Sequence, residues 1–205
     1  QNGALNLSQG FPDFNGPQPL LDAVGRHVAA GNNQYAPMTG LPVLRQQVAA
    51  KIARLYGAQV DADQEVTITP GATEAIFCAI QAVIQAGDEV IVFDPSYDSY
   101  EPSVELAGGR CVHVQLSDGD FRIDWQKFSD ALTPRTRMVI LNSPHNPSGA
   151  LITREDLDQL AALIAERDIY LVSDEVNEHL VYDGVRHASV LAHPQLYARA
   201  FEIGR

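Results

Sequence analysis

The fold is decided by the stretch Tyr170-Leu171-Val172-Ser173-Asp174-Glu175, which comes late in a chain of 205 residues. Residues 169–172 are apolar and lack the spacing of a helix, so they predict a buried strand. The strand ends on two carboxylates, and a buried charge without a partner is strongly penalised. We therefore expect a cationic group next to Asp174, at the strand's carboxyl end, where open α/β sheets bind their ligands.

Composition and charge exclude several kinds of function. The chain is 45% hydrophobic and 20% charged, which is ordinary for a globular domain. Its formal net charge of -12 argues against nucleic acid or an anionic membrane as the main partner, although a local site can still bind a phosphorylated small molecule. There is no membrane-spanning run or signal segment, and Cys78 and Cys111 have neither disulfide nor metal spacing. We therefore expect a cytoplasmic protein.

Strand and helix patterns alternate along the chain. Apolar runs predict strands at residues 90–93, 138–141 and 169–173, and alternation of apolar and polar residues predicts strands at residues 65–69 and 111–116. Helical spacing predicts helices at residues 20–28, 44–55, 72–85 and 98–107, and two more that begin at the caps Asp124 and Thr153, the latter with Asp156 in a capping box. This alternation predicts an α/β fold with a mostly parallel sheet.

Polar or turn-forming clusters follow four of these strands. They are Thr69-Pro70-Gly71, Asp94-Pro95-Ser96, Asn142-Ser143-Pro144 and the acid Asp174. The carboxyl ends of parallel strands lie on one edge of a sheet, so one site can collect all four clusters.

Gly71-Ala72-Thr73-Glu74 lies where a strand turns into a helix. The glycine permits a tight turn, and the free amides of Ala72 and Thr73 would form a phosphate seat at the positive end of the helix. The alternative is a plain turn with Thr73 as the helix cap. The stretch lacks the glycines of a dinucleotide fingerprint and the lysine of a P-loop.

Two further positions suit a planar ligand. Tyr97 could stack on a ring, or it could be an ordinary core tyrosine. Asn142 and Asn146 flank Ser143-Pro144-His145, so a side-chain amide could donate to a ligand oxygen, although the segment could also be a simple proline-rich turn. Together with Asp174, these residues indicate a phosphorylated heterocycle with a cationic nitrogen.

Six motifs follow one another along the chain. They are Ser8-Gln9-Gly10-Phe11-Pro12-Asp13-Phe14, Asn33-Gln34-Tyr35, Gly71-Ala72-Thr73-Glu74-Ala75, Asp94-Pro95-Ser96-Tyr97, Ser143-Pro144-His145-Asn146-Pro147-Ser148-Gly149 and Ser173-Asp174-Glu175-Val176. In this order they resemble the class I and II aminotransferases of fold type I, whose cofactor is pyridoxal 5'-phosphate. Within that family the wording is most similar to bacterial methionine aminotransferases and kynurenine–oxoglutarate aminotransferases.

The resemblance covers residues 5 to about 197 and implies a domain organisation. Residues 1–16 would be an N-terminal arm. Residues 17–205 would be a partial pyridoxal-phosphate-binding large domain, a three-layer α/β unit with helices on both faces of the sheet, incomplete at its C-terminus. The small C-terminal domain would be absent.

The resemblance also implies roles for single residues. Asp174 would keep the pyridine nitrogen protonated, so that the ring acts as an electron sink. Asn146 would donate to the 3-hydroxyl oxygen and Tyr97 would stack on the ring. Ala72 and Thr73 would bind the phosphate. The substrates would be an amino acid and a 2-oxo acid.

The N-terminal motifs imply shared sites in a homodimer. Gly10 would approach the substrate carboxylate, and Tyr35 would reach the cofactor phosphate of the neighbouring subunit. One position departs from the family pattern. Asn177 stands where the family usually has a tyrosine that helps to hold the 3-hydroxyl oxygen, so we expect weaker cofactor binding.

The larger departure concerns lysine. The chemistry needs a lysine that forms a Schiff base and moves a proton, but the chain has only Lys51 and Lys127. Both are predicted to be solvated surface charges, and His187 and His193 are predicted to lie in surface loops. The resemblance stops near Ala200, before the strand and the catalytic lysine that should follow. We therefore expect this chain to be truncated and inactive alone.

Two alternative functions remain open. One keeps the fold and cofactor but performs a carbon–sulfur β-lyase reaction, which releases pyruvate from cysteine conjugates without an oxo acid. The other is a non-catalytic, degenerate protein that needs a partner chain to supply missing strands.

Overall fold

The computed structural model describes residue 10 and residues 12–204. Ser8, Gln9 and Phe11 of the first motif therefore lie outside the described residues. The chain divides into two compact units, residues 1–38 and 39–205. The first unit contains helix α1 (Gln18–Ala29), which confirms the helix predicted at residues 20–28.

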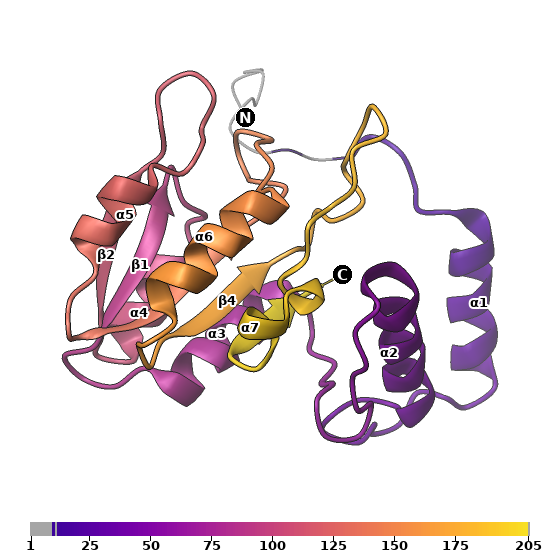
Figure 1. The fold of residues 1–205 in the computed structure, drawn as a ribbon. Helices are drawn as coiled ribbons and strands as arrows, with labels where there is room; N and C mark the ends of the chain where they lie inside the picture. The colour runs from indigo at the N-terminus through magenta and orange to yellow at the C-terminus, as the bar shows by residue number, and fades with distance from the viewer. Residues whose placement is uncertain (1–9, 11, 205) are drawn as a thin grey trace, which may run out of the picture. The chain divides into compact units, whose positions relative to one another are not determined.

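The second unit is built on a sheet of five parallel strands. These are β1 (Glu89–Asp94), β2 (Arg110–Gln115), β3 (Thr136–Asn142), β4 (Tyr170–Asp174) and β5 (Ala200–Ile203), arranged in the order β2-β1-β3-β4-β5. The helices are α2 (Pro42–Tyr56), α3 (Ala72–Val83), α4 (Tyr100–Leu106), α5 (Trp125–Ala131), α6 (Arg154–Ile164) and the short α7 (Pro194–Tyr197), which follows a 3-10 turn at Val190–Ala192. Figure 1 shows their arrangement.

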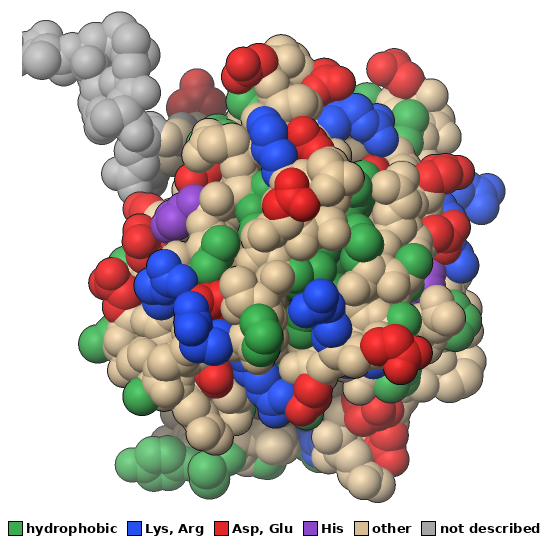
Figure 2. All heavy atoms as spheres, turned by 60° about the vertical axis from the view of Figure 1, so that its left-hand side comes forward, with side chains coloured by type: hydrophobic (Ala, Val, Ile, Leu, Met, Phe, Trp, Pro, Cys, Tyr) green, Lys and Arg blue, Asp and Glu red, His purple; other side chains and the backbone are tan. Residues whose placement is uncertain are grey.

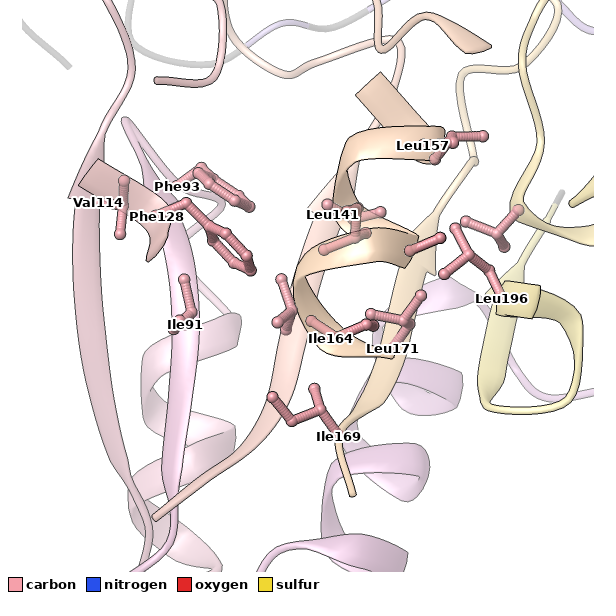
Figure 3. Close-up of a cluster of buried hydrophobic side chains, with 14 of the residues drawn as sticks. Ile91, Phe93, Val114, Phe128, Leu141, Leu157, Ile164, Ile169, Leu171 and Leu196 are labelled. Carbon is pink, nitrogen blue, oxygen red and sulfur yellow. The ribbon is translucent and has the colours of Figure 1, made fainter. Parts of the chain in front are cut away.

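Helices cover both faces of the sheet, as expected for a three-layer α/β fold. Alternate strand residues such as Val92 and Ile140 pack against α3 and α4 on one face. Their neighbours, such as Phe93 and Leu141, pack against α5 and α6 on the other (Figure 3). The central strands β1 and β3 are buried over most of their length, which is why their middle residues appear in the sequence as continuous hydrophobic runs, whereas β2 is partly exposed.

Local signals explain where the helices begin and end. The Asp124 carboxylate accepts hydrogen bonds from the backbone amides of Gln126 and Lys127, so it caps α5 as predicted. Thr153 and Asp156 form the predicted capping box at the start of α6. Helix α2 ends at Gly57, which has a φ of 72°, a left-handed conformation that glycine adopts without strain.

The strand predicted at residues 65–69 is wrong. This segment is irregular. Its described backbone contacts include one hydrogen bond to a distant part of the chain, from the Ile68 amide to the Thr39 carbonyl at 3.1 Å. Val66 is buried, so the alternation in the sequence reports burial of one side of the segment. A strand also needs a hydrogen-bonded neighbour, and the pattern does not show whether one is available.

The expectation that the strand after Ala200 is missing is also wrong. Residues Ala200–Ile203 form β5, which pairs in parallel with β4. Ile203 is buried against the same core as Val172, so its burial stabilises this pairing.

The surface carries both acidic and basic side chains, although the chain has a net negative charge. Figure 2 shows acidic and basic side chains intermixed on the face that carries β2 and α5. Some of the surface charges are paired, such as Arg137 with the exposed carboxylate of Asp168. None of the helices within residues 12–204 is long and apolar enough to cross a bilayer.

The core on the α5 and α6 side is expected to be sensitive to truncation at Phe128. This side chain is fully buried, stacked on Phe93 with ring centres 6.0 Å apart and in edge contact with Trp125. The substitution Phe128→Ala should lower the free energy of unfolding by about 3–5 kcal/mol, measured by urea denaturation. The control Phe77→Ala, at a residue 38% exposed on α3, should cost far less. Equal losses in the two variants would contradict this assignment of the core.

Candidate functional site

The order of the strands places a site between β1 and β3. The chain leaves β1 for β2 on one side and returns to β3 on the other side of β1. Such a switch point opens a crevice at the carboxyl ends of the two strands. The segment 95–99 follows β1 and the segment 143–152 follows β3, and Asn142 of β3 lies opposite Asp174 of β4. Three of the four predicted polar clusters therefore meet at one edge of the sheet.

Asp174 is a buried carboxylate that, among the described residues, accepts hydrogen bonds only from neutral donors. Its side chain Oδ2 accepts a hydrogen bond from the Tyr100 hydroxyl at 2.6 Å, and Oδ1 accepts one from the Val176 amide at 3.2 Å. Among the described residues, no lysine, arginine or histidine forms an ion pair with it. Burial raises the pKa of Asp174, and the Tyr100 hydrogen bond opposes that rise.

A second buried acid shows what a carboxylate with cationic partners looks like. Glu89 begins β1 at the opposite end of the sheet and accepts hydrogen bonds from Thr133, Arg110 and Arg135. These contacts lower the pKa of Glu89 to about 2, against the opposing effect of burial. The contrast indicates that Asp174 lacks the cation that a structural acid obtains from its own chain.

Asn142 connects β4 to the loop that carries Asn146. Its side-chain amide donates to the Asp174 carbonyl at 3.0 Å, and its side-chain oxygen accepts from the Asn146 backbone amide at 2.7 Å. Asn146 is thereby fixed beside the end of β3, with an exposed side chain. The sequence singled out both asparagines, but it could not show that one holds the backbone of the other.

Tyr97 and Asn177 belong to the segments that follow β1 and β4 at this edge. The Tyr97 ring is half-buried and meets the Tyr100 ring edge-on, with centres 5.6 Å apart. The Asn177 amide nitrogen donates to the Pro144 carbonyl at 3.3 Å, which ties the segment after β4 to the loop after β3. An amide nitrogen carries two hydrogens, so Asn177 keeps one for another acceptor.

The start of α3 is open for an anion. Gly71 precedes the helix with a φ of 99°, and among the described residues no side chain caps this end. Thr73 is exposed and is not the cap, so the alternative of a turn capped by Thr73 is wrong. Ala72, Tyr97 and Val176 pack against one hydrophobic cluster, which brings this helix start to the same side of the sheet as Asp174.

Gly10 and Tyr35 belong to the first unit, and both are exposed. Their roles in contacting the substrate and a neighbouring subunit stay predictions.

Sequence reasoning missed Tyr100 and misjudged Lys51. Tyr100 was included only as part of a predicted helix, yet it is 3% exposed and binds Asp174. The prediction that Lys51 is a solvated surface charge is wrong, because its ammonium group pairs with the buried carboxylate of Glu178. The helical spacing placed Lys51 on the polar side of α2, but it could not show that this side faces a buried acid. Lys127 is exposed, 3.9 Å from Asp124, as predicted.

Two histidines predicted in surface loops are also buried. His187 Nε2 lies 2.7 Å from the Glu175 carboxylate, and His193 Nε2 lies 2.9 Å from Asp158. Each side chain is only 5% exposed. His193 lies between the 3-10 turn at Val190–Ala192 and α7, and the sequence did not reveal either element.

Comparison with known proteins gives consistent results. A family model for aminotransferase class I and II matches residues 2–201. The chain is 53% identical over 203 residues to the methionine aminotransferase of Escherichia coli (strain K12), which covers 99% of this chain and 53% of the relative. It is 35% identical over 218 residues to kynurenine–oxoglutarate transaminase 1 of Homo sapiens, covering 100% of this chain and 51% of that protein.

Solved structures agree with the sequence matches. The structure of YbdL from Escherichia coli, described as a methionine aminotransferase, superimposes with a TM-score of 0.95 at 53% identity, covering 98% of this chain and 53% of that one. The N-succinyldiaminopimelate aminotransferase of Mycobacterium tuberculosis gives a TM-score of 0.93 at 42% identity, covering 98% and 53%. The chain spans about half the length of the curated relatives it matches.

The hydrogen bond from Tyr100 should control the ionisation of Asp174. Because this bond lowers the pKa of Asp174, the substitution Tyr100→Phe should raise that pKa further. A pH titration of the carbon-13 carboxyl resonance of Asp174 measures the change. Tyr97→Phe, which removes a hydroxyl from the adjacent ring, is the control and should leave the pKa in place. An unchanged Asp174 in Tyr100→Phe would show that the bond is absent in solution.

Proposed function

Because the chain belongs to the class I and II aminotransferase family, we propose that it forms much of the cofactor-binding domain of a pyridoxal 5'-phosphate-dependent aminotransferase. The reaction moves an amino group from an amino acid to a 2-oxo acid. Methionine and kynurenine are the proposed donors, since relatives named for both match the chain over nearly its whole length.

The observation that carries the proposal is the buried carboxylate of Asp174. It is 7% exposed and accepts hydrogen bonds from Tyr100 and Val176, which are both neutral donors. A carboxylate oxygen can accept a second hydrogen bond, so the site retains room for a cationic donor. A protonated pyridine nitrogen has the charge and the hydrogen that this carboxylate lacks. The residues present therefore fit the cofactor.

Other residues would hold the remaining parts of the cofactor. The amides of Ala72 and Thr73 at the uncapped start of α3 would bind the phosphate. Tyr97 would stack on the ring, and Asn146 and the second hydrogen of Asn177 would donate to the ring oxygen. When bound, the cofactor supplies an electron sink for the electron pair released at the substrate α-carbon.

The environments of the two lysines of the chain argue that it cannot carry out amino transfer by itself. The Lys51 ammonium is committed to Glu178, and Lys127 is exposed on α5 beside Asp124. Neither is available to accept a proton from the substrate α-carbon and return it. We therefore propose that the 205-residue chain binds the cofactor but does not transaminate by itself.

The proposed assembly is a homodimer in the cytoplasm. Tyr35 would reach the neighbouring subunit's phosphate and Gly10 would approach the substrate carboxylate. Both residues are exposed in the first unit, which leaves them accessible for such contacts. The free thiols of Cys78 and Cys111 suit a reducing compartment.

The substitution Asp174→Asn should weaken binding of pyridoxal 5'-phosphate by about tenfold to a hundredfold, because the charge-assisted hydrogen bond to the pyridine nitrogen is lost. Visible absorbance of the cofactor during titration measures the affinity. The matched control is Asp168→Asn, which removes an exposed acid just before β4, at its other end, and should leave the affinity unchanged. Equal affinity in Asp174→Asn and the unsubstituted protein would refute the site.

Amino transfer should require a further protein segment in addition to this chain. The chain alone should give no multiple turnovers with methionine and a 2-oxo acid. Joining it to the part of the Escherichia coli methionine aminotransferase that it does not match should yield amino transfer, measured as new amino acid formed. Multiple turnovers by the chain alone would overturn the limit set by its lysines. Pyruvate released from a cysteine conjugate without an oxo acid would instead favour a carbon–sulfur β-lyase.

A further inference from the structure

Glu178 is a buried acid whose carboxylate is bound by two residues of another element. It lies just after β4 and is 3% exposed. The Lys51 ammonium forms an ion pair with one of its carboxylate oxygens, and the Tyr56 hydroxyl donates to the other. Both partners come from α2. Burial raises the pKa of Glu178, but these two contacts outweigh burial and leave it below its usual value.

Glu175 anchors the same segment at its other end. Its carboxylate accepts hydrogen bonds from the Ser173 hydroxyl at 2.8 Å and the Val190 amide at 3.1 Å, and it lies 2.7 Å from His187 Nε2. The His187 ring meets the Tyr56 ring edge-on, with centres 6.1 Å apart. The two anchors are therefore in contact with each other through α2.

Asn177 lies between the two anchors. The Glu178 amide donates to the Glu175 carbonyl at 2.8 Å, so residues 175–178 form a tight turn. The Asn177 side chain extends from this turn to the loop after β3, where its amide donates to the Pro144 carbonyl at 3.3 Å. An asparagine side chain is short and has few rotatable bonds, so its amide can move only slightly while its backbone stays in place. The location of the turn therefore decides where its amide lies.

We propose that Lys51 and Tyr56 are positioning residues, which act through Glu178 to place the Asn177 amide for the cofactor ring. This proposal rests on the proposed function, because the acceptor for Asn177 is an oxygen of that ring. It assigns a role in cofactor binding to a helix that contributes no residue to the predicted site.

The surrounding charges explain why Glu178 depends on Lys51. Glu175, Asp174 and Glu202 all face the same region as acids, while His179 is exposed, 3.6 Å from Glu178. Burial and its acidic neighbours raise the pKa of Glu202 to about 8, so Glu202 is mostly uncharged at neutral pH. Removing the Lys51 ammonium would leave Glu178 buried without its closest cation, which strongly favours movement of the turn toward water.

The test compares four variants with the unsubstituted protein. Lys51→Met removes the charge but keeps most of the side-chain volume, and Lys51→Arg restores a charge. Tyr56→Phe removes one hydroxyl. Glu202→Gln is the matched control, because it alters an acid of the same region that is already mostly uncharged and binds neither Lys51 nor Tyr56. Two properties are measured: the nitrogen-15 resonance of the Asn177 side-chain amide without cofactor, and the affinity for pyridoxal 5'-phosphate.

Lys51→Met should move the Asn177 resonance and weaken cofactor binding by about tenfold or more. Lys51→Arg should return both toward the original values, and Tyr56→Phe should weaken binding by about fivefold, as expected for one hydrogen bond. Glu202→Gln should change the affinity by less than about twofold, since the uncharged amide closely replaces an uncharged acid.

An unmoved Asn177 resonance in folded Lys51→Met would overturn the proposal. If Lys51→Met does not fold, the same decision rests on Tyr56→Phe, where an unmoved resonance overturns it. If the unsubstituted protein does not bind the cofactor, the proposed function fails, while the Asn177 resonance measured without cofactor still decides whether α2 positions this side chain.

Discussion

The buried carboxylate of Asp174 is the constraint around which the carboxyl edge of the sheet is arranged. Strand β4 delivers it to that edge, where it is 7% exposed and has no cationic partner among the described residues. Tyr100 from α4 and Asn142 from β3 both bind Asp174, one at its carboxylate and one at its carbonyl. Three elements are thereby held together at a group whose charge is only partly compensated, which suits a site for a cationic ligand.

Buried acids at the two ends of the sheet differ in whether they have cationic partners. At the amino end, Glu89 has two arginines and is a purely structural acid. At the carboxyl end, Glu178 obtains Lys51 and Glu175 obtains His187, while Asp174 is left with neutral donors. The chain therefore gives Glu178 a cationic partner on α2, whereas Asp174 accepts hydrogen bonds from neutral donors. The folded chain is less stable for having Asp174 buried without a cation, at the position where a bound ligand would supply the missing positive charge.

Much of the architecture could be predicted because strands buried on both faces must be apolar. The runs at residues 90–93, 138–141 and 169–173 became β1, β3 and β4 for this reason, and the capping box of α6 was visible as Thr153 with Asp156. Residues 65–69 misled because alternation reports which side is buried, whereas a strand also requires a neighbour to bond with. Strand β5 was missed for a different reason, because the family resemblance stops near Ala200 and no strand was expected beyond it.

Residue type and local spacing were enough to predict the kind of fold, the family, and the short motifs that end each strand. They did not show which acid is paired with which donor, because that depends on how distant segments pack together. Tyr100 with Asp174, Lys51 with Glu178 and His187 with Glu175 are separated by 74, 127 and 12 positions. Nothing in local spacing encodes such pairs. They form because packing of helices against the sheet buries acids that must then find the nearest donor.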